Sequence, residues 1–217
     1  MTKRRFRFRY PEWREIDAHK WVTWRAGRYG DGDNPQYFGL IERIEKKEPF
    51  SAEDFDQIGR WKEGCPKPDN GRWKTGTPVA YDVWMEAKKE LPKCPDATGI
   101  TAFLMDWSER TFVAGGDKRK KTFGLSRATT LLHFVSVGEF PILDRRVVTA
   151  MMRLGSPIDE AETIGGYLNS FCPLFSELAD VCGLSGLRGR KTLDNALFNY
   201  GAETSFPSSP FAAASAV

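Results

Sequence analysis

Apolar residues recur at intervals of three and four along most of this 217-residue chain, and glycine or proline interrupts the pattern repeatedly. This spacing places apolar side chains on one face of a helix. Residues 125–135 are typical, because Ala128, Leu131, Leu132 and Val135 share a face. Similar runs predict helices over 51–62, 77–91, 98–111 and 159–182 (split at Gly165-Gly166 and Pro173), one after Asp144, and one between Thr192 and Gly201. We therefore expect a mainly α fold, with at most a minor β element in the alternating segment 5–10.

Composition bounds the class of protein. Hydrophobic residues make up 41% and charged residues 28% of the chain, which is typical of soluble globular proteins. No segment reaches the roughly 18 apolar residues of a membrane span, and no apolar stretch follows the basic N-terminus as in a signal peptide. We expect a cytoplasmic protein without a membrane partner. The Ser/Ala/Pro-rich residues 207–217 are predicted to be disordered.

Histidine and cysteine are too few and too scattered for metal chemistry. The two histidines are His19 and His133, and the four cysteines are Cys65, Cys94, Cys172 and Cys182. No pair of cysteines has the two-residue gap of a zinc site, and no group has iron–sulfur spacing. The sequence predicts free thiols, no metal and no cofactor.

Positive charge is segregated along the chain. The whole chain carries +3, whereas residues 1–30 carry nine basic and three acidic side chains. A second basic run surrounds the turn at Gly124 and comprises Lys118, Arg119, Lys120, Lys121 and Arg127. A glycine turn that opens a helix presents unpaired backbone N–H groups, which can bind a phosphate. A solvated basic loop is the alternative interpretation.

Asp144 stands directly before the helix that contains Val147, Val148, Met151 and Met152. An aspartate there can serve only as a helix N-cap, a contribution of about 1 kcal/mol to stability. It can also place a carboxylate at a reaction centre. Taken by itself, the residue favours the cap.

Residues 123–155 together resemble the helix-hairpin-helix DNA glycosylases, the superfamily of endonuclease III and the alkylpurine glycosylases. The family's hairpin reads Leu-Pro-Gly-Val-Gly-Arg-Lys-Thr-Ala, and its catalytic stretch reads Val-Asp-Thr-His-Val before a helix that ends in Leu-Gly. The matching residues here are Gly124, Leu125, Arg127 and Thr129, then Leu143-Asp144-Arg145-Arg146-Val147 and Leu154-Gly155. Ser126 replaces the second hairpin glycine, and Ala128 stands where bifunctional members carry a lysine.

The resemblance implies a two-lobed helical bundle with a helix-hairpin-helix DNA-binding element, a single domain over residues 1–206. The helices in 77–182 would form one lobe, and the N- and C-terminal segments would pack together as the other. It implies a monomeric DNA N-glycosylase without AP-lyase activity, since Ala128 cannot form a Schiff base. Its partner would be double-stranded DNA with a damaged or modified base, in base-excision DNA repair or antiviral defence.

Asp144 would be the catalytic residue. The DNA backbone would contact Gly124, Leu125, Ser126, Arg127, Lys118, Lys120, Lys121, Arg145 and Arg146. The pocket for the flipped base would draw on Trp61, Lys62, Trp73, His133 and Tyr200, with Asn195 and Asn199 able to line the cleft. His133 is expected on the polar side of its helix, facing either DNA or solvent.

Two other functions remain open. The chain could be a non-catalytic helix-hairpin-helix DNA-binding module in which Asp144 is only a cap, or an all-α scaffold whose basic N-terminal arm binds acidic partners. The identity of the excised base is also open among uracil, alkylated purines, oxidised guanine and hypermodified viral bases.

Overall fold

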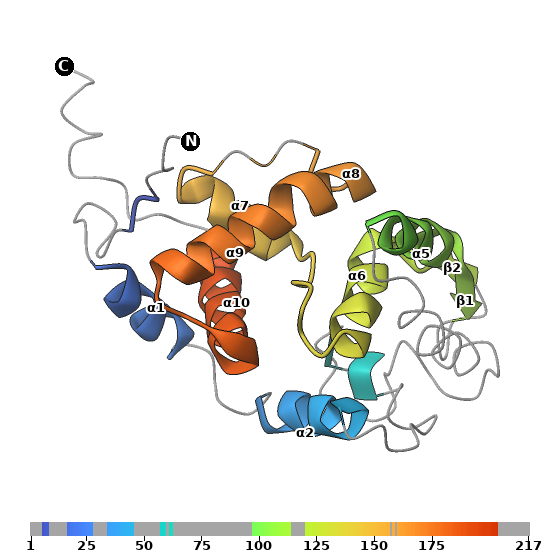
Figure 1. Cartoon of the computed structure of the whole chain (residues 1–217), viewed down its shortest axis with the longest axis horizontal. Helices are drawn as coiled ribbons and strands as arrows, with labels where there is room; N and C mark the ends of the chain where they lie inside the picture. The colour runs from blue at the N-terminus through green and yellow to red at the C-terminus, as the bar shows by residue number, and fades with distance from the viewer. Residues whose placement is uncertain are drawn as a thin grey trace. The chain divides into compact units, whose positions relative to one another are not determined.

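The chain is mainly helical in a computed structural model, as the spacing of its apolar residues predicts (Figure 1). The structure describes residues 6–8, 17–27, 34–45, 57–59, 61–62, 97–113, 120–156, 158 and 160–203. The helix predicted over 77–91, Trp73 and the tail 207–217 lie outside these residues. Most of the segment 51–62 also lies outside them, with residues 57–59 and 61–62 described as helical.

The chain divides into two compact units, and their limits differ from those expected. Unit 1 comprises Met1–Gly30 and Asp144–Val217, and unit 2 comprises Asp31–Leu143. The expected boundaries at residues 77 and 182 are therefore wrong. The second boundary falls between Leu143 and Asp144 because Leu143 bonds to a helix of unit 2, whereas Asp144 begins a helix that packs within unit 1.

Unit 2 contains α2 (Asn34–Glu45), α5 (Ala97–Glu109), β1 (Thr111–Val113), β2 (Lys120–Thr122) and α6 (Gly124–Val135). Helices α5 and α2 both pack against α6. The buried residues of unit 2 include Leu104, Trp107 and Leu131, which lie on the faces predicted from the sequence, and Phe134, which lies outside the predicted face of its helix. Burial of such side chains contributes about 1.5–3 kcal/mol each.

A minor β element lies in unit 2. Strands β1 and β2 pair antiparallel, with Thr111 opposite Thr122 and Val113 opposite Lys120. Between them in the sequence lies the basic, glycine-rich segment 114–119. Residues 6–8, part of the alternating N-terminal segment, are not in a strand.

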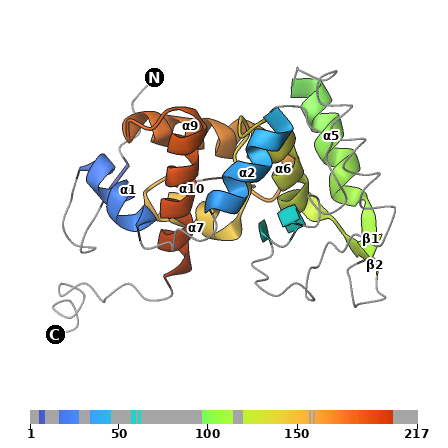
Figure 2. The ribbon, with the colours of Figure 1, turned by 90° about the horizontal axis from the view of Figure 1, so that it is seen from below.

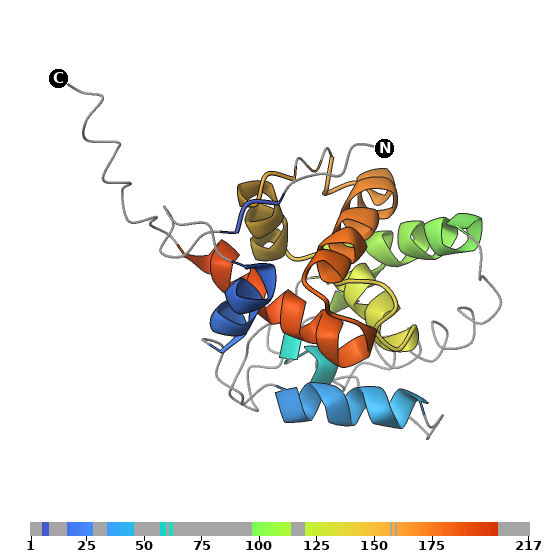
Figure 3. The ribbon, with the colours of Figure 1, turned by 60° about the vertical axis from the view of Figure 1, so that its left-hand side comes forward.

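Unit 1 contains α1 (Ala18–Ala26), α7 (Arg145–Arg153), α8 (Ile164–Gly166), the π-helix η4 (Tyr167–Phe171), α9 (Cys172–Val181) and α10 (Gly186–Ala202). Helices α1 and α7 both lie against α10 (Figures 2 and 3). The N-terminal helix of the chain thus packs on the C-terminal helix. The buried Arg25 of α1 pairs with Glu203, and the side-chain amide of Asn199 donates to the Arg25 carbonyl over 2.8 Å.

Two helix predictions in unit 1 are wrong. The run over 159–182 is not split at Gly165-Gly166 and Pro173, because α8, η4 and α9 follow one another without a break. The wider π turns lie just ahead of Pro173, which has no N–H to donate to the helix. Helix α10 begins at Gly186, so Thr192 lies inside it, and the helix continues past Gly201.

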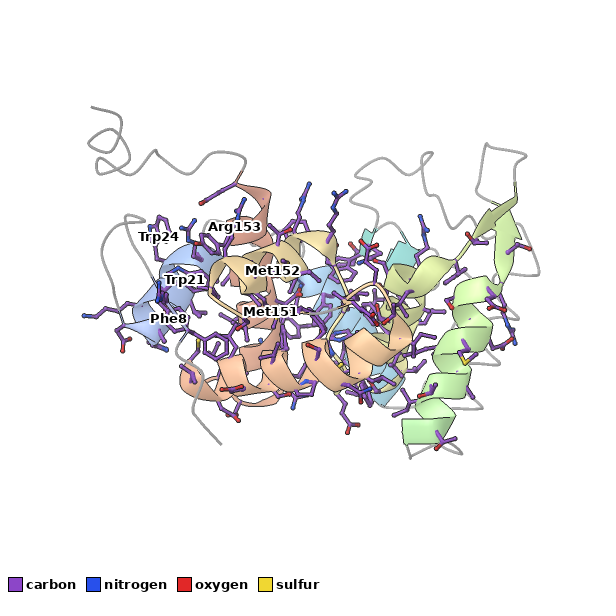
Figure 4. The ribbon with its side chains drawn as sticks, turned by 90° about the horizontal axis from the view of Figure 1, so that it is seen from above. Phe8, Trp21, Trp24, Met151, Met152 and Arg153 are labelled. Atoms are coloured by element: carbon purple, nitrogen blue, oxygen red, sulfur yellow. The ribbon has the colours of Figure 1, made fainter. Side chains whose placement is uncertain are left out.

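The N-terminal arm docks on the end of α7. The Arg7 N–H donates to the Leu154 carbonyl over 3.1 Å, which satisfies a carbonyl at the C-terminus of that helix. Phe8 is buried with its ring 5.5 Å from that of Trp21, whereas Arg7 is exposed. Figure 4 shows Phe8 and Trp21 beside each other at α1. Within the described residues, no helix is long and apolar enough to cross a membrane.

Candidate functional site

A glycine in the left-handed region opens α6, at the position where the sequence predicts a phosphate-binding turn. Gly124 opens the helix with a φ of 68°, which glycine adopts without strain. Phe123 precedes it, and a phenyl ring offers no acceptor that could cap the helix. The Arg127 guanidinium donates to the Phe123 carbonyl over 3.1 Å. The backbone N–H groups of this turn and the helix dipole therefore favour an anion.

Hydroxyl groups near the start of α6 hold the residue before Asp144. The Ser126 hydroxyl donates to the Leu143 carbonyl over 2.8 Å, and the Leu143 N–H donates to the Thr129 hydroxyl over 3.1 Å. The Thr129 hydroxyl in turn donates to the Ser126 carbonyl. The extended segment 141–143 thus returns to the start of α6, and both backbone groups of Leu143 are bonded there.

Asp144 is the N-cap of α7, as its sequence position predicts. Its backbone is extended (φ −122°, ψ 136°), and its Oδ1 accepts a hydrogen bond from the Arg146 N–H over 2.9 Å. The side chain is half-buried. A side-chain acceptor at this position pairs with one of the N–H groups that the first turn of a helix leaves unpaired. The structure therefore confirms the cap. The Arg146 N–H fixes the position of the carboxylate, at the residue where the second segment of unit 1 begins.

Side chains of α7 contact α10 at both ends of α7. The Arg146 guanidinium lies 4.5 Å above the ring of Phe198. At the other end, the Arg153 guanidinium donates to the carbonyls of Tyr200 (2.7 Å) and Glu203 (3.1 Å). In Figure 4, Arg153 and the exposed Met152 mark this end of α7. Arg145 is exposed beside Asp144, as a phosphate contact requires.

His133 lies in an aromatic cluster inside unit 2, so its expected placement on the polar side of the helix is wrong. It is buried against the rings of Tyr37 and Phe134, which both also contact Trp61. Its Nδ1 lies 2.6 Å from the Phe140 carbonyl, and its Nε2 lies 2.6 Å from the Tyr37 hydroxyl. Because a carbonyl only accepts, Nδ1 donates to Phe140, and the Tyr37 hydroxyl is the hydrogen-bond partner of Nε2. Hydrogen bonding explains why a histidine is buried here.

The residues predicted for the base pocket are divided between the two units. Trp61 and Lys62 are half-buried in unit 2 with His133. Tyr200 is buried in unit 1, where the Arg25 guanidinium lies 4.5 Å from its ring. Asn195 is also buried in unit 1. Trp73, Lys118 and the side chains of Lys120 and Lys121 lie outside the described part of the structure.

Sequence reasoning missed two residues that contact Arg146, two positions after Asp144. Phe198 supports Arg146, and Gly201 lies against the backbone of the same arginine. Phe198 lies within the helix predicted at the C-terminal end, but the spacing of apolar residues does not indicate that an arginine lies above its ring. A glycine near the end of a helical pattern reads most simply as a stop signal, which concealed the contact made by Gly201.

The described cysteines do not add a nucleophile to the site. Cys172 and Cys182 are free thiols. Burial raises the pKa of each to about 12. A thiol is nucleophilic as the thiolate, so both are inert near neutral pH. Among the described residues, no three His, Cys, Asp or Glu side chains form a group that could hold a metal ion.

Comparisons with protein-family models, curated proteins and solved structures found no match to this chain.

Proposed function

We propose that this chain is a monofunctional DNA glycosylase that hydrolyses the N-glycosidic bond of a damaged or modified base flipped out of duplex DNA. The observation that carries the proposal is the Asp144 carboxylate, held by the Arg146 N–H at the start of α7. It lies within the segment that resembles the family's catalytic stretch. The product would be an abasic site, in DNA repair or in defence against modified foreign DNA.

The chemistry requires one carboxylate and a water molecule. Departure of the base builds oxocarbenium-like positive charge on the sugar, which a nearby carboxylate stabilises. At 4 Å and an effective dielectric constant of 20, the Coulomb energy is about 4 kcal/mol. This corresponds to about a thousandfold in rate. Asp144 would supply this stabilisation and orient the attacking water.

The first turn of α6 supports a role in gripping the DNA backbone. Its backbone N–H groups, Arg127 and the basic run before it would bind phosphates, while base flipping would cost a few kcal/mol. Ala128 is fully buried in unit 2, at the position where bifunctional members carry a lysine. The first turn therefore offers no amine at that position, which supports hydrolysis without strand cleavage.

A second candidate function is a non-catalytic DNA-binding module. The bond from the Arg146 N–H to Asp144 favours it, because N-capping alone accounts for an aspartate at this position. The two functions differ in whether the charge of Asp144, rather than its hydrogen bond, is needed.

The Asp144→Asn substitution separates charge from capping, since asparagine caps a helix about as well as aspartate. Free bases released from a panel of damaged and naturally modified DNAs would be measured by mass spectrometry. We expect release to fall by about a thousandfold or more. DNA affinity should stay nearly unchanged and should decrease with salt, as several phosphate contacts require.

Asp17→Asn is the matched control. Asp17 caps α1 by accepting from the His19 and Lys20 N–H groups, so the same chemical change is made at another N-cap of unit 1. We expect this variant to release base at the unsubstituted rate. Base release by Asp144→Asn at that rate would overturn the catalytic assignment. Salt-dependent DNA binding without release from any substrate would favour the binding module, and a flat salt response would favour the scaffold.

A further inference from the structure

Helix α10 approaches the first turn of α7 so closely that only glycine fits at position 201. A Cβ atom built on Gly201 would overlap the Arg146 carbonyl oxygen and would lie 2.5 Å from its carbonyl carbon and 2.9 Å from its Cα. These atoms are backbone and cannot rotate away as a side chain can. The missing side chain of Gly201 therefore determines how closely α7 seats on α10.

Phe198 lies one helical turn before Gly201, on the same face of α10. Its ring supports the Arg146 guanidinium at 4.5 Å. One residue of α7 is thus held twice by α10, through its backbone at Gly201 and through its side chain at Phe198. A cation above an aromatic face is attracted to it, so the two contacts reinforce one orientation of the turn.

Arg146 is also the residue whose N–H holds the Asp144 carboxylate, over 2.9 Å. A shift of the Arg146 backbone away from α10 would therefore carry this N–H with it and change the position of the carboxylate. We infer that Gly201 and Phe198 are positioning residues for Asp144. The inference rests on the proposed function. A misplacement of about 1 Å at a reacting group can cost about 100-fold in rate.

The test is Gly201→Ala in the full chain, with Gly39→Ala as the matched control. Gly39 lies within α2, and a Cβ there meets no atom within 4 Å. Alanine favours a helix over glycine, so both substitutions raise helix propensity equally. We expect Gly201→Ala to lower the single-turnover rate of base release at saturating enzyme by about 100-fold. Its DNA dissociation constant should stay within about threefold, whereas Gly39→Ala should change neither quantity.

Amide hydrogen exchange of α7, measured by NMR, gives a readout that does not depend on activity. We expect the Arg146 amide to exchange faster in Gly201→Ala and at the unsubstituted rate in Gly39→Ala, because displacement of the turn weakens its bond to Asp144. Unchanged exchange at Arg146, or an unchanged release rate in folded Gly201→Ala, would overturn the positioning role. Absence of base release by the unsubstituted protein would instead overturn the proposed function. The exchange experiment would still show whether Gly201 determines the packing of α7 on α10.

Phe198→Leu keeps the inference testable if Gly201→Ala fails to fold. Leucine retains apolar bulk but removes the ring beneath Arg146. We expect a smaller loss in release rate, about threefold, again without a matching loss of DNA affinity. A loss of affinity equal to the loss of rate would show that Phe198 acts through DNA binding, its own or that of Arg146, or through the fold, rather than by positioning Asp144.

Discussion

The Ser126 hydroxyl donates a hydrogen bond to the Leu143 carbonyl over 2.8 Å, although the two residues are 17 positions apart. Ser126 stands where the hairpin that this segment resembles has a glycine, and glycine could not make this bond. With the bond between the Leu143 N–H and Thr129, it fastens the residue before Asp144 to the first turn of α6. The departure from the hairpin pattern therefore has a structural use.

Ser126→Ala should lower the free energy of unfolding by about 1 kcal/mol, the net contribution of a typical hydrogen bond. Urea unfolding followed by circular dichroism would measure it. The control is Ser108→Ala, since the Ser108 hydroxyl also donates to a carbonyl, but to Met105 within its own helix. We expect the control to change stability by less than about 0.5 kcal/mol. Equal losses of stability in the two variants would show that the bond to Leu143 stabilises the protein no more than a hydroxyl bond within a single helix does.

Tyr37→Phe should lower the free energy of unfolding by about 1–3 kcal/mol, because it removes the hydroxyl that bonds to the buried Nε2 of His133. The aromatic ring is retained, so packing against Trp61 and Phe134 is preserved. Thermal and urea unfolding of the two proteins would give the difference. A variant as stable as the unsubstituted protein would mean that Tyr37 does not support His133.

Borohydride should trap no covalent complex between this protein and abasic DNA. Trapping needs a Schiff base from an amine, and Ala128 occupies the position where bifunctional members of the resembled family carry a lysine. Gel electrophoresis after reduction would detect an adduct, with a bifunctional glycosylase as the positive control. A robust adduct with this protein would contradict hydrolysis without strand cleavage.

Stability should decrease as the pH rises above about 9. Burial raises the pKa of the Cys182 thiol from 9.0 to about 12, and the nearby charge of Asp17 adds to this rise in pKa. The unfolded chain then releases this thiol proton at a lower pH than the folded chain. The contribution of the thiol to the free energy of unfolding is therefore fully present below pH 9 and is lost between pH 9 and 12. Burial raises the pKa of Cys172 to about 12 as well, although its hydrogen bond to Tyr167 opposes the rise in pKa.

Urea unfolding at intervals from pH 7 to pH 11 would measure this loss. Cys182→Ala should lose less stability between pH 9 and 11 than the unsubstituted protein, whatever its stability at pH 7. An identical decrease in both proteins would show that Cys182 does not contribute to it.

Local patterns predicted the elements that depend on local chemistry. The helical period of residues 125–135 and the aspartate before Val147 were sufficient for α6 and for the cap of α7, because amphipathic spacing and N-capping act within a few residues. They failed at Thr192, where a capping residue lies inside α10. A hydroxyl within a helix can instead donate to the carbonyl four residues earlier, as Thr192 does to Arg188.

The amino-acid sequence alone determined that the chain is mainly helical, that α6 starts at a glycine turn, and that Asp144 begins α7. Only the tertiary structure decided three contacts. Ser126 donates a hydrogen bond to Leu143, His133 is buried against Tyr37, and the Arg146 backbone packs directly against Gly201. These contacts join residues 17, 96 and 55 positions apart, so no local spacing encodes them. All three arise only when the folded chain packs closely. At Gly201, the absence of a Cβ sets the distance between two helix backbones.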